Sequence, residues 1–211
     1  MGTIRNIVFD FGGVLIDLKR SSTIAAMQKL GITDFDKELS NNYSCDGFLG
    51  QYEKGLITTP EFRNIIRQKA CNCSLADIVI DNAWCALMQD VPTYKLELLL
   101  QLKKRFRIYM LSNTNELHIR YSLKQCFEKG NYTVSDYFDR LFFSYEMHLS
   151  KPDLQIFQSF ITESGVIPEE TLYIDDAPVN IKAGNECRLQ SRLYIPGDDL
   201  TQLFRNEGLL N

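Results

Sequence analysis

The chain has 211 residues, of which 45% are hydrophobic and 24% charged, and its formal net charge is −4 at pH 7. This length is enough for one full hydrophobic core and a smaller insert, and the composition is that of an ordinary soluble globular protein. The mild acidity argues against a nucleic-acid partner, and the lack of any apolar run near ~20 residues argues against a membrane span.

The N-terminal residues and the cysteines favour a cytoplasmic protein. The first apolar run begins at Ile4, which leaves no room for a secretory signal. Cysteines occur at positions 45, 71, 73, 85, 126 and 187. Cys71 and Cys73 are separated by one residue, which is too close for a zinc knuckle, and no second pair follows. We therefore expect reduced, structural cysteines. The sequence leaves the oligomeric state open.

The first predicted element is a buried strand that ends in an acid. The apolar run from Ile4 to Phe9 leads directly to Asp10, and Phe11-Gly12-Gly13-Val14 follows at once. A parallel strand that delivers a carboxylate to a glycine-rich turn at its carboxyl end has this pattern.

The next stretch, residues 17–88, contains helical patterns and no convincing strand. The predicted helices cover 22–30, 34–39, 47–54, 59–70 and 74–88. Thr59-Pro60 and the Ser74/Asp77 pair are typical helix starts. Because this all-helical insert leaves the chain beside Asp10, we expect a cap domain that can close over the site. The sequence does not settle which of Asp46, Phe48, Tyr52 and Glu53 face the site. Trp84 is predicted to be a core residue of this insert, with a substrate contact as the alternative.

From residue 89 on, strands and helices alternate. The predicted strands are 106–111, 140–144, 172–175 and 192–195, and the predicted helices are 93–104, 117–127, 153–164 and 179–186. Such alternation predicts a parallel sheet with helices on both faces. We therefore expect an α/β, doubly wound, Rossmann-like core made of residues 1–16 and 89–211, with the helical cap of residues 17–88 inserted into it.

Polar side chains follow several of these strands. Ser112-Asn113-Thr114-Asn115 follows the second strand, Lys151-Pro152 precedes a helix, and Asp175-Asp176 ends the fourth strand. Because parallel strands end at a common edge, Asp10, Asp175 and Asp176 are predicted to meet in one crevice. Carboxylates that close repel each other unless a hard cation such as Mg²⁺ neutralises them, so the sequence predicts a metal-assisted site.

These motifs, in this order, resemble those of the haloacid dehalogenase-like hydrolase superfamily. The resemblance rests on residues 9–15, 111–115, 150–153 and 174–180, and the helical insert looks like the first type of cap in that superfamily. The Leu-Ser-Asn-Thr-Asn motif is similar to that of the α-glucose-1-phosphate phosphatase branch.

The resemblance implies a Mg²⁺-dependent phosphatase that acts on a small phosphorylated metabolite, with a sugar phosphate favoured. Asp10 is the candidate nucleophile, which would form an aspartyl-phosphate. Lys151 would offset negative charge at the reacting centre. The Ser112 hydroxyl and the Asn113 and Thr114 amides, at a helix start, would bind phosphate oxygens. The expected metal ligands are Asp10, the Gly12 carbonyl, Asp175 and Asp176, with Asn180 in support.

Gly12 departs from the superfamily pattern. Most of these phosphatases carry a second Asp, the general acid/base, two residues after the nucleophile, whereas the glucose-1-phosphate type also has Gly there. Without that acid, we expect activated phosphates to be preferred over alkyl esters. Two alternatives stay open: a hydrolytic dehalogenase, which needs no metal, and a catalytically silent binding or regulatory protein. His118 and His148 are predicted to be structural.

Overall fold

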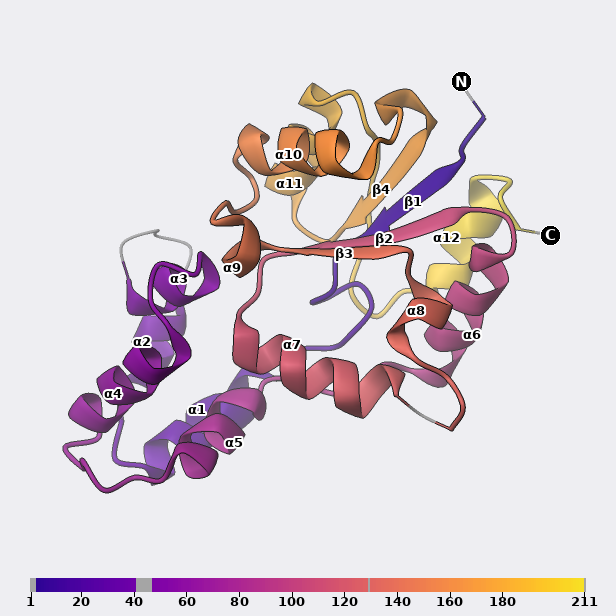
Figure 1. The fold of residues 1–211 in the computed structure, drawn as a ribbon. Helices are drawn as coiled ribbons and strands as arrows, with labels where there is room; N and C mark the ends of the chain where they lie inside the picture. The colour runs from indigo at the N-terminus through magenta and orange to yellow at the C-terminus, as the bar shows by residue number, and fades with distance from the viewer. Residues whose placement is uncertain (1–2, 41–46, 129, 211) are drawn as a thin grey trace.

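The computed structural model describes residues 3–40, 47–128 and 130–210. Its centre is a five-stranded parallel sheet in the order β3-β2-β1-β4-β5 (Figure 1). The strands are β1 (Asn6–Phe9), β2 (Arg107–Ser112), β3 (Arg140–Phe143), β4 (Thr171–Asp175) and β5 (Gln190–Leu193). The chain builds outward from β1 to β3 and then returns to β4 on the other side of β1. This confirms the predicted α/β, doubly wound core and places the change of direction between β1 and β4.

The central strands are apolar on both faces. In β1, Ile7 and Phe9 belong to one buried cluster, whereas Val8 belongs to the cluster on the opposite face. The neighbouring strands continue this alternation in register, since Val8 pairs with Tyr109 in β2 and with Tyr173 in β4. Successive side chains of a strand point to opposite faces, so a strand covered on both sides must be apolar throughout.

Helices cover both faces of this sheet. Helices α6 (Thr93–Lys103), α8 (Val134–Tyr137) and α12 (Leu200–Asn206) supply buried residues to the cluster around Phe9. Helices α10 (Leu154–Ser164) and α11 (Pro178–Glu186) pack on the other face (Figure 1). The remaining short elements are α7 (Glu116–Ser122), the π-helical turn η2 (Leu123–Phe127), α9 (Ser144–Met147) and η3 (Pro168–Glu170).

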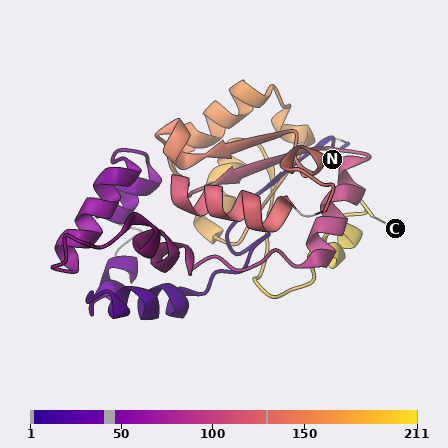
Figure 2. The same ribbon diagram turned by 60° about the horizontal axis from the view of Figure 1, so that its bottom comes forward.

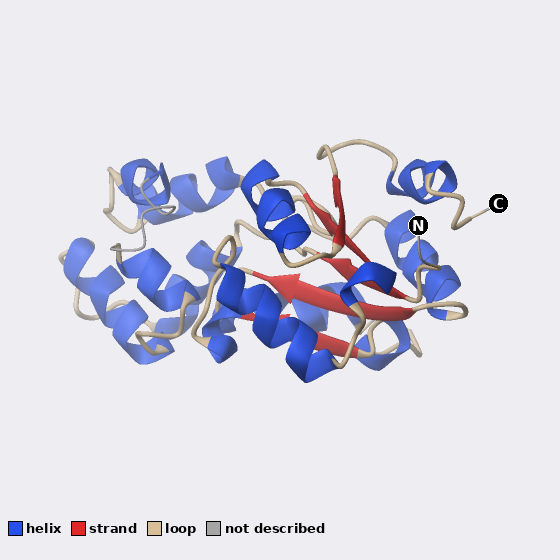
Figure 3. Ribbon diagram, turned by 90° about the horizontal axis from the view of Figure 1, so that it is seen from above, coloured by secondary structure: helices blue, strands red, loops and turns tan. Residues whose placement is uncertain are grey.

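In the described part of the chain, five helices between β1 and α6 form a separate mass beside the sheet (Figures 2 and 3). They are α1 (Arg20–Lys29), α2 (Phe35–Ser40), α3 (Phe48–Glu53), α4 (Thr59–Lys69) and α5 (Asp77–Cys85). We call them the helical segment. They enclose their own buried cluster, in which Trp84 packs on Phe35 and Phe62. Leu117 of α7 is also part of this cluster.

The two connections to the helical segment lie side by side. The Lys19 amide donates to the Leu87 carbonyl at 2.8 Å, and the Gln89 amide donates to the Asp17 carbonyl at 3.1 Å. Leu18 and Met88 thus form an antiparallel bridge. The chain therefore leaves the core and returns to it at one place, next to the turn that follows Asp10.

Several element boundaries differ from those predicted. The predicted helix over 117–127 is divided into α7 and the π-helical turn. Helix α5 begins at Asp77 after Ala76, so the predicted Ser74 cap does not form, and α4 is capped by Thr58, one residue before the predicted start. The short helices α8, α9 and α12 were not predicted, because four to seven residues give little periodicity.

Two further findings concern the described residues. None of their helices is long and apolar enough to span a membrane. Their five cysteines are free thiols, and Cys45 lies outside the described residues. Cys85 and Cys126 are buried, whereas Cys71 and Cys73 are exposed.

Candidate active site

Three carboxylates meet at the point where the sheet changes direction. Asp10 follows β1, Asp175 ends β4 and Asp176 comes directly after it. One carboxylate oxygen from each lies within 4.8 Å of the others. Asp10 and Asp175 are buried and Asp176 is half-buried. The structure thus brings together the three acids that the sequence places at the carboxyl edge of the sheet.

Lys151 lies between two of these acids. Its Nζ is 2.8 Å from Asp10 Oδ1 and 2.6 Å from Asp175 Oδ2, and the side chain is almost wholly buried. Burial alone would lower the pKa of Lys151, but Asp10 and Asp175 raise it above its usual value, so the ammonium stays charged. The position of Lys151 follows from the loop before α10, which the Asn113 side chain holds through hydrogen bonds to the Lys151 backbone N and O, both 2.9 Å.

The pKa values of the two aspartates that face Lys151 are shifted in opposite directions. Burial raises the pKa of Asp10 to about 7; Lys151 opposes this rise and Asp175 adds to it. Burial also acts on Asp175, but Lys151 and hydrogen bonds outweigh it and lower the pKa. The two differ in hydrogen bonding, because Asp175 accepts hydrogen bonds from the Asn180 side chain, the Ala177 amide and the Tyr173 hydroxyl, which stabilise its charged form.

Asp176 is the most exposed of the three acids and lines the cavity together with Asp10. Its pKa is raised, first by burial and then by the neighbouring Asp175 charge. It leans over Gly13, which has φ +78°, and a Cβ on Gly13 would lie 2.1 Å from Asp176 Oδ2. Glycine is therefore required at position 13 by both its backbone conformation and the close approach of this carboxylate.

The structure places the predicted phosphate-binding residues Ser112, Asn113 and Thr114 at the end of β2 and in the turn after it. Ser112 and Thr114 are buried, and the Thr114 amide donates to Ser144 Oγ at 2.8 Å, so that amide is not directed at a ligand. Helix α7 begins only at Glu116, after Asn115 as N-cap, so the amides of 113 and 114 precede the helix. Asn113 is the residue of this turn that lines the cavity.

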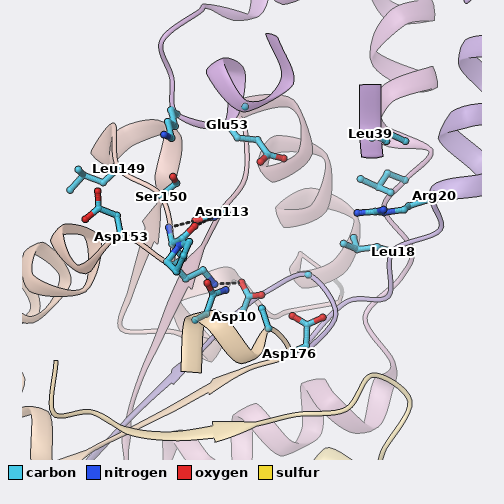
Figure 4. Close-up of a pocket in the computed structure, with 18 of the residues that line it drawn as sticks. Asp10, Leu18, Arg20, Leu39, Glu53, Asn113, Leu149, Ser150, Asp153 and Asp176 are labelled. Atoms are coloured by element: carbon cyan, nitrogen blue, oxygen red, sulfur yellow. Dashed lines mark hydrogen bonds and ion pairs between the residues drawn. The ribbon is translucent and has the colours of Figure 1, made fainter. Parts of the chain in front are cut away.

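A cavity of about 410 Å³ lies above the acids, between the sheet edge and the helical segment (Figure 4). Asp10 and Asp176 lie at one end of it, and Glu53 of α3 reaches in from the opposite side (Figure 4). Leu18, Arg20 and Leu39 form one wall (Figure 4). The loop before α10 forms the other wall with residues 148–153. Charged groups therefore stand at both ends of a partly apolar chamber.

The structure separates the candidate residues of the helical segment. Glu53 lines the cavity, whereas Tyr52 is buried and its hydroxyl contacts Thr59 at 2.8 Å. Phe48 stacks on Phe62 within the helical cluster. Asp46 lies outside the described residues. Trp84 belongs to the helical core and also contributes to the cavity wall, so the two readings of this residue are compatible.

The two histidines have structural contacts. His118 is buried behind the cavity, and His148 lies on its wall with Nδ1 3.0 Å from the Lys54 carbonyl oxygen. His148 has φ +55° and ends α9.

Sequence reasoning missed two supporting residues. Tyr173, whose hydroxyl donates to Asp175, lies two residues before it on the same strand; this spacing puts both on one face of the sheet and could have revealed the pair. Ser144 follows β3 and donates to the Glu53 carbonyl at 2.5 Å, so it joins the sheet edge to the helical segment. The position of Ser144 at the end of a strand could have marked it as a site residue, but its partner Glu53 lies 91 residues away in the sequence and could not be inferred from local pattern.

The donor set fits a divalent metal ion. Three carboxylates lie within mutual reach, and Lys151 forms ion pairs with two of them, so negative charge remains in excess among these four groups. Oxygen ligands of this kind are those that Mg²⁺ prefers. Asp10 and Asp176 line the cavity together with Gly12, whereas Asp175 is fully buried and engaged by protein donors.

A doubly wound sheet with an acidic centre at its change of direction, facing a chamber under a helical segment, defines an α/β protein with a candidate metal-assisted site. Comparison with known proteins identifies its family. A family model for haloacid dehalogenase-like hydrolases matches residues 4–188, and the chain belongs to this family. The family predicted from the sequence motifs is thereby confirmed.

Individual relatives agree with this assignment. The chain is 37% identical over 188 residues to a D-ribitol-5-phosphate phosphatase from Bacteroides thetaiotaomicron, covering 89% of this chain and 90% of that protein. A crystal structure of a haloacid dehalogenase (HAD) family enzyme from the same organism, in complex with magnesium and inorganic phosphate, superposes with a TM-score of 0.91 at 39% identity. The match covers 96% of this chain and 100% of that one. A predicted HAD-like hydrolase from Porphyromonas gingivalis has a TM-score of 0.88 at 28% identity, covering 98% of both chains. The narrower resemblance to α-glucose-1-phosphate phosphatases stays a prediction.

Proposed function

We propose that this hydrolase is a Mg²⁺-dependent phosphatase of small phosphorylated polyols or sugars, and that Asp10 is its nucleophile. The observation that carries the proposal is the Asp10 carboxylate, which lines the cavity beside Asp176 and is paired with Lys151 at 2.8 Å. The relative named for D-ribitol-5-phosphate and the related structure with magnesium and phosphate support the same chemistry.

In this proposal the chain's own residues divide the work. An Asp10 oxygen attacks phosphorus as the bond from phosphorus to the ester oxygen breaks, which forms an aspartyl-phosphate; the departing oxygen takes a proton from water and leaves as the alcohol. Water then hydrolyses the aspartyl-phosphate and regenerates Asp10. Lys151 keeps a positive charge at the reacting carboxylate and phosphoryl group. Asn113 holds the Lys151 backbone in place through two hydrogen bonds, and Asp175 orients the Lys151 ammonium.

The acids also divide between metal binding and support. Asp10, Asp176 and the Gly12 carbonyl would hold Mg²⁺, which when bound stabilises charge on the phosphoryl oxygens. We place Asp175 beside this set as the residue that fixes Lys151, since the Asn180, Tyr173 and Ala177 donors already engage its oxygens. The metal role predicted for Asp175 is thus proposed to be indirect.

The helical segment, residues 17–88, is proposed to act as the cap domain of the core formed by residues 1–16 and 89–211. The carboxylates and Lys151 of the core offer groups for a phosphoryl unit, and the segment is proposed to supply contacts to the rest of the substrate. Glu53 and Arg20 face the cavity from that side (Figure 4) and can hydrogen-bond to hydroxyl groups of a sugar or sugar alcohol. The segment also covers the reaction from bulk water.

The test is hydrolysis of a panel of phosphate monoesters, with D-ribitol 5-phosphate, D-glucose 1-phosphate and an aryl phosphate among them. We expect turnover in Mg²⁺, its loss in excess EDTA and its recovery when Mg²⁺ is restored. Asp10→Asn should reduce turnover to near background while circular dichroism shows a retained fold. Activity of Asp10→Asn within about tenfold of wild type, a barrier change of ~1.4 kcal/mol, would exclude Asp10 as the nucleophile.

The same panel decides between this proposal and its rivals. A metal-independent rate on a 2-haloacid, with none on phosphate esters, would establish the dehalogenase alternative. No turnover of either class would favour a silent binding protein. The magnitude of kcat/KM across the panel would identify the preferred class of phosphate.

A further inference from the structure

Trp84, Asn115 and His118 form a closed set of buried hydrogen bonds between α5 and the first turn of α7. Asn115 Oδ1 accepts from Trp84 Nε1 at 3.2 Å and from the His118 amide at 3.1 Å. Asn115 Nδ2 lies 3.1 Å from His118 Nδ1, and His118 Nε2 lies 3.2 Å from the Trp84 carbonyl oxygen. The indole and imidazole rings are stacked, with centroids 4.4 Å apart and planes 16° apart.

The donors and acceptors fix the state of His118. Because Asn115 Oδ1 receives two N–H donors, the amide nitrogen of Asn115 is the atom that faces Nδ1, and Nδ1 must accept. Nε2 therefore carries the proton and donates to the Trp84 carbonyl. The imidazole is neutral in this arrangement, and burial lowers the pKa of His118 to about 4, although the Trp84 carbonyl acts in the opposite direction. Every ring nitrogen of Trp84 and His118 has a partner.

This set joins two parts of the proposed active site. Asn115 directly follows the turn of residues 112–114, whose Asn113 holds the Lys151 backbone. Trp84 contributes to the cavity wall. His118 itself neither holds the Lys151 backbone nor lines the cavity, because it is buried behind the wall with 4% of its surface exposed. Its contacts with the other two residues are its means of affecting the site.

Further contacts bind the same turn of α7 to the helical segment. The Leu117 amide donates to the Tyr52 hydroxyl at 3.4 Å, and Cys85 Sγ lies 3.6 Å from the Leu117 carbonyl oxygen. Thr59 Oγ1 also donates to Glu116. Figure 1 shows α7 between the sheet and helices α1 and α5. The first turn of α7 is thus built into the helical segment while it directly continues the polar turn of the core.

We propose that His118 is a positioning residue: by fixing the Asn115 amide it holds the turn of residues 112–115 against Trp84, so that the phosphate site and this wall of the substrate cavity move as one unit. The proposal rests on the proposed phosphatase function, because it takes Lys151, whose backbone is held by Asn113 of this turn, to be part of the phosphate site. It predicts that a change at the phosphate site is felt at Trp84 and that this response requires the nitrogens of His118.

The test uses the fact that Trp84 is the single tryptophan of the chain, so tryptophan emission reports on this wall. The wild-type protein in Mg²⁺ is titrated with inorganic phosphate while emission is recorded, and phosphate inhibition of turnover is measured in parallel. We expect emission to change along the same binding curve as inhibition. In His118→Phe, which keeps a flat ring but has no nitrogen, the response should be lost and phosphate affinity should fall about tenfold.

Two further variants separate positioning from space filling. His118→Asn restores an acceptor for the Asn115 amide and should recover part of the emission response and of the affinity. Cys85→Ala removes a contact from the same α5–α7 interface without touching Trp84, Asn115 or His118 side chains, and should behave as wild type in both measurements. Circular dichroism and thermal denaturation establish that each variant is folded.

The proposal is overturned if His118→Phe keeps the wild-type emission response and an affinity within about twofold, or if Cys85→Ala shows the same loss as His118→Phe. It is also overturned if phosphate inhibits the wild-type protein without changing Trp84 emission. If emission reports phosphate binding in the wild type and this response is lost in His118→Phe, but no phosphate ester is hydrolysed, the role of His118 is supported and the result counts against the proposed function instead.

Discussion

Substitution of Gly12 by aspartate tests how this protein protonates the leaving group. Gly12 is not among the residues with positive φ, so a side chain there needs no strained backbone. A Cβ would lie 2.9 Å from Leu18 Cδ1, the far end of a flexible side chain that is 45% exposed. Leu18 can move by the few tenths of an ångström required, and we expect Gly12→Asp to fold.

The magnitude follows from the surroundings of the new carboxyl group. It would stand on the cavity wall with Asp10 and Asp176, whose charges raise its pKa where bound Mg²⁺ does not offset them and so favour the protonated form that a general acid needs. General acid help is typically worth about 10²–10⁴-fold. Since the surrounding residues do not position this added acid, we expect an effect at or below the lower end of that range. The kcat/KM for an alkyl phosphate such as D-ribitol 5-phosphate should rise about tenfold to a hundredfold, which corresponds to a barrier lower by ~1.4–2.7 kcal/mol. Aryl phosphates, whose leaving groups need no proton, should change little.

The assay is kcat/KM for phosphate esters of graded leaving-group pKa, measured for the wild type, Gly12→Asp and two controls. Gly12→Ala adds the Cβ alone, and Gly12→Asn adds a side chain of the same size without an acidic proton. In the wild type, kcat/KM should fall steeply as the leaving-group pKa rises, and Gly12→Asp should flatten that slope. A flat wild-type profile with chemistry rate-limiting, or equal gains in Gly12→Asn, would refute the reasoning and mean that another group supplies the proton.

Three other predictions concern charge in and around the site. Lys151→Met leaves Asp10 and Asp175 without their buried cation and should lower the free energy of unfolding by about 3 kcal/mol, measured by urea denaturation; a loss below about 1 kcal/mol would contradict the ion-pair geometry. The raised pKa of Asp10 means that metal-free protein gains stability from this group below about pH 4 and loses it as pH rises through about 7, so the Tm increase on adding Mg²⁺ should be larger at about pH 8 than at about pH 5. His118, with its lowered pKa, contributes in the opposite sense with or without metal and cancels in this difference. Glu53→Gln should change the ranking of sugar and sugar-alcohol phosphates while leaving a small aryl phosphate within about twofold, and equal losses on all substrates would argue against a cap role for Glu53.

The sheet and its acids could be predicted because they depend on local pattern and on one rule of topology. Apolar runs that end in Asp10 and Asp175 mark strands buried on both faces, and parallel strands bring their carboxyl ends to one edge. Lys151 could be placed at the same edge by its order in the chain. The sequence did not reveal that the Asp175 carboxylate accepts hydrogen bonds from Tyr173, Asn180 and Ala177, while the Asp176 carboxylate is open to the cavity. That difference depends on side-chain direction.

Contacts between distant elements were the harder part. Tyr52 and Glu53 are neighbours in α3, yet the first is buried in the helical cluster and the second lines the cavity. Their helix has six residues, which is too short for an apolar stripe to be read with certainty. The Thr114 amide was expected to bind an anion, but a hydroxyl from Ser144, 30 residues away, accepts its hydrogen bond. Pairings across such separations depend on packing that no local pattern encodes.

The entry of Leu117 into the helical cluster has a consequence for protein engineering. The paired connections at Leu18 and Met88 suggest that the helical segment could be cut out and exchanged between related enzymes as a cassette. Such a cut would expose Leu117 and would remove Trp84, the hydrogen-bond partner of Asn115 and His118. Leu117, Asn115 and His118 nevertheless belong to the core by their position in the sequence. A functional chimaera would have to transplant residues 115–118 with the segment, because the boundary of the exchangeable unit in space is not its boundary along the chain.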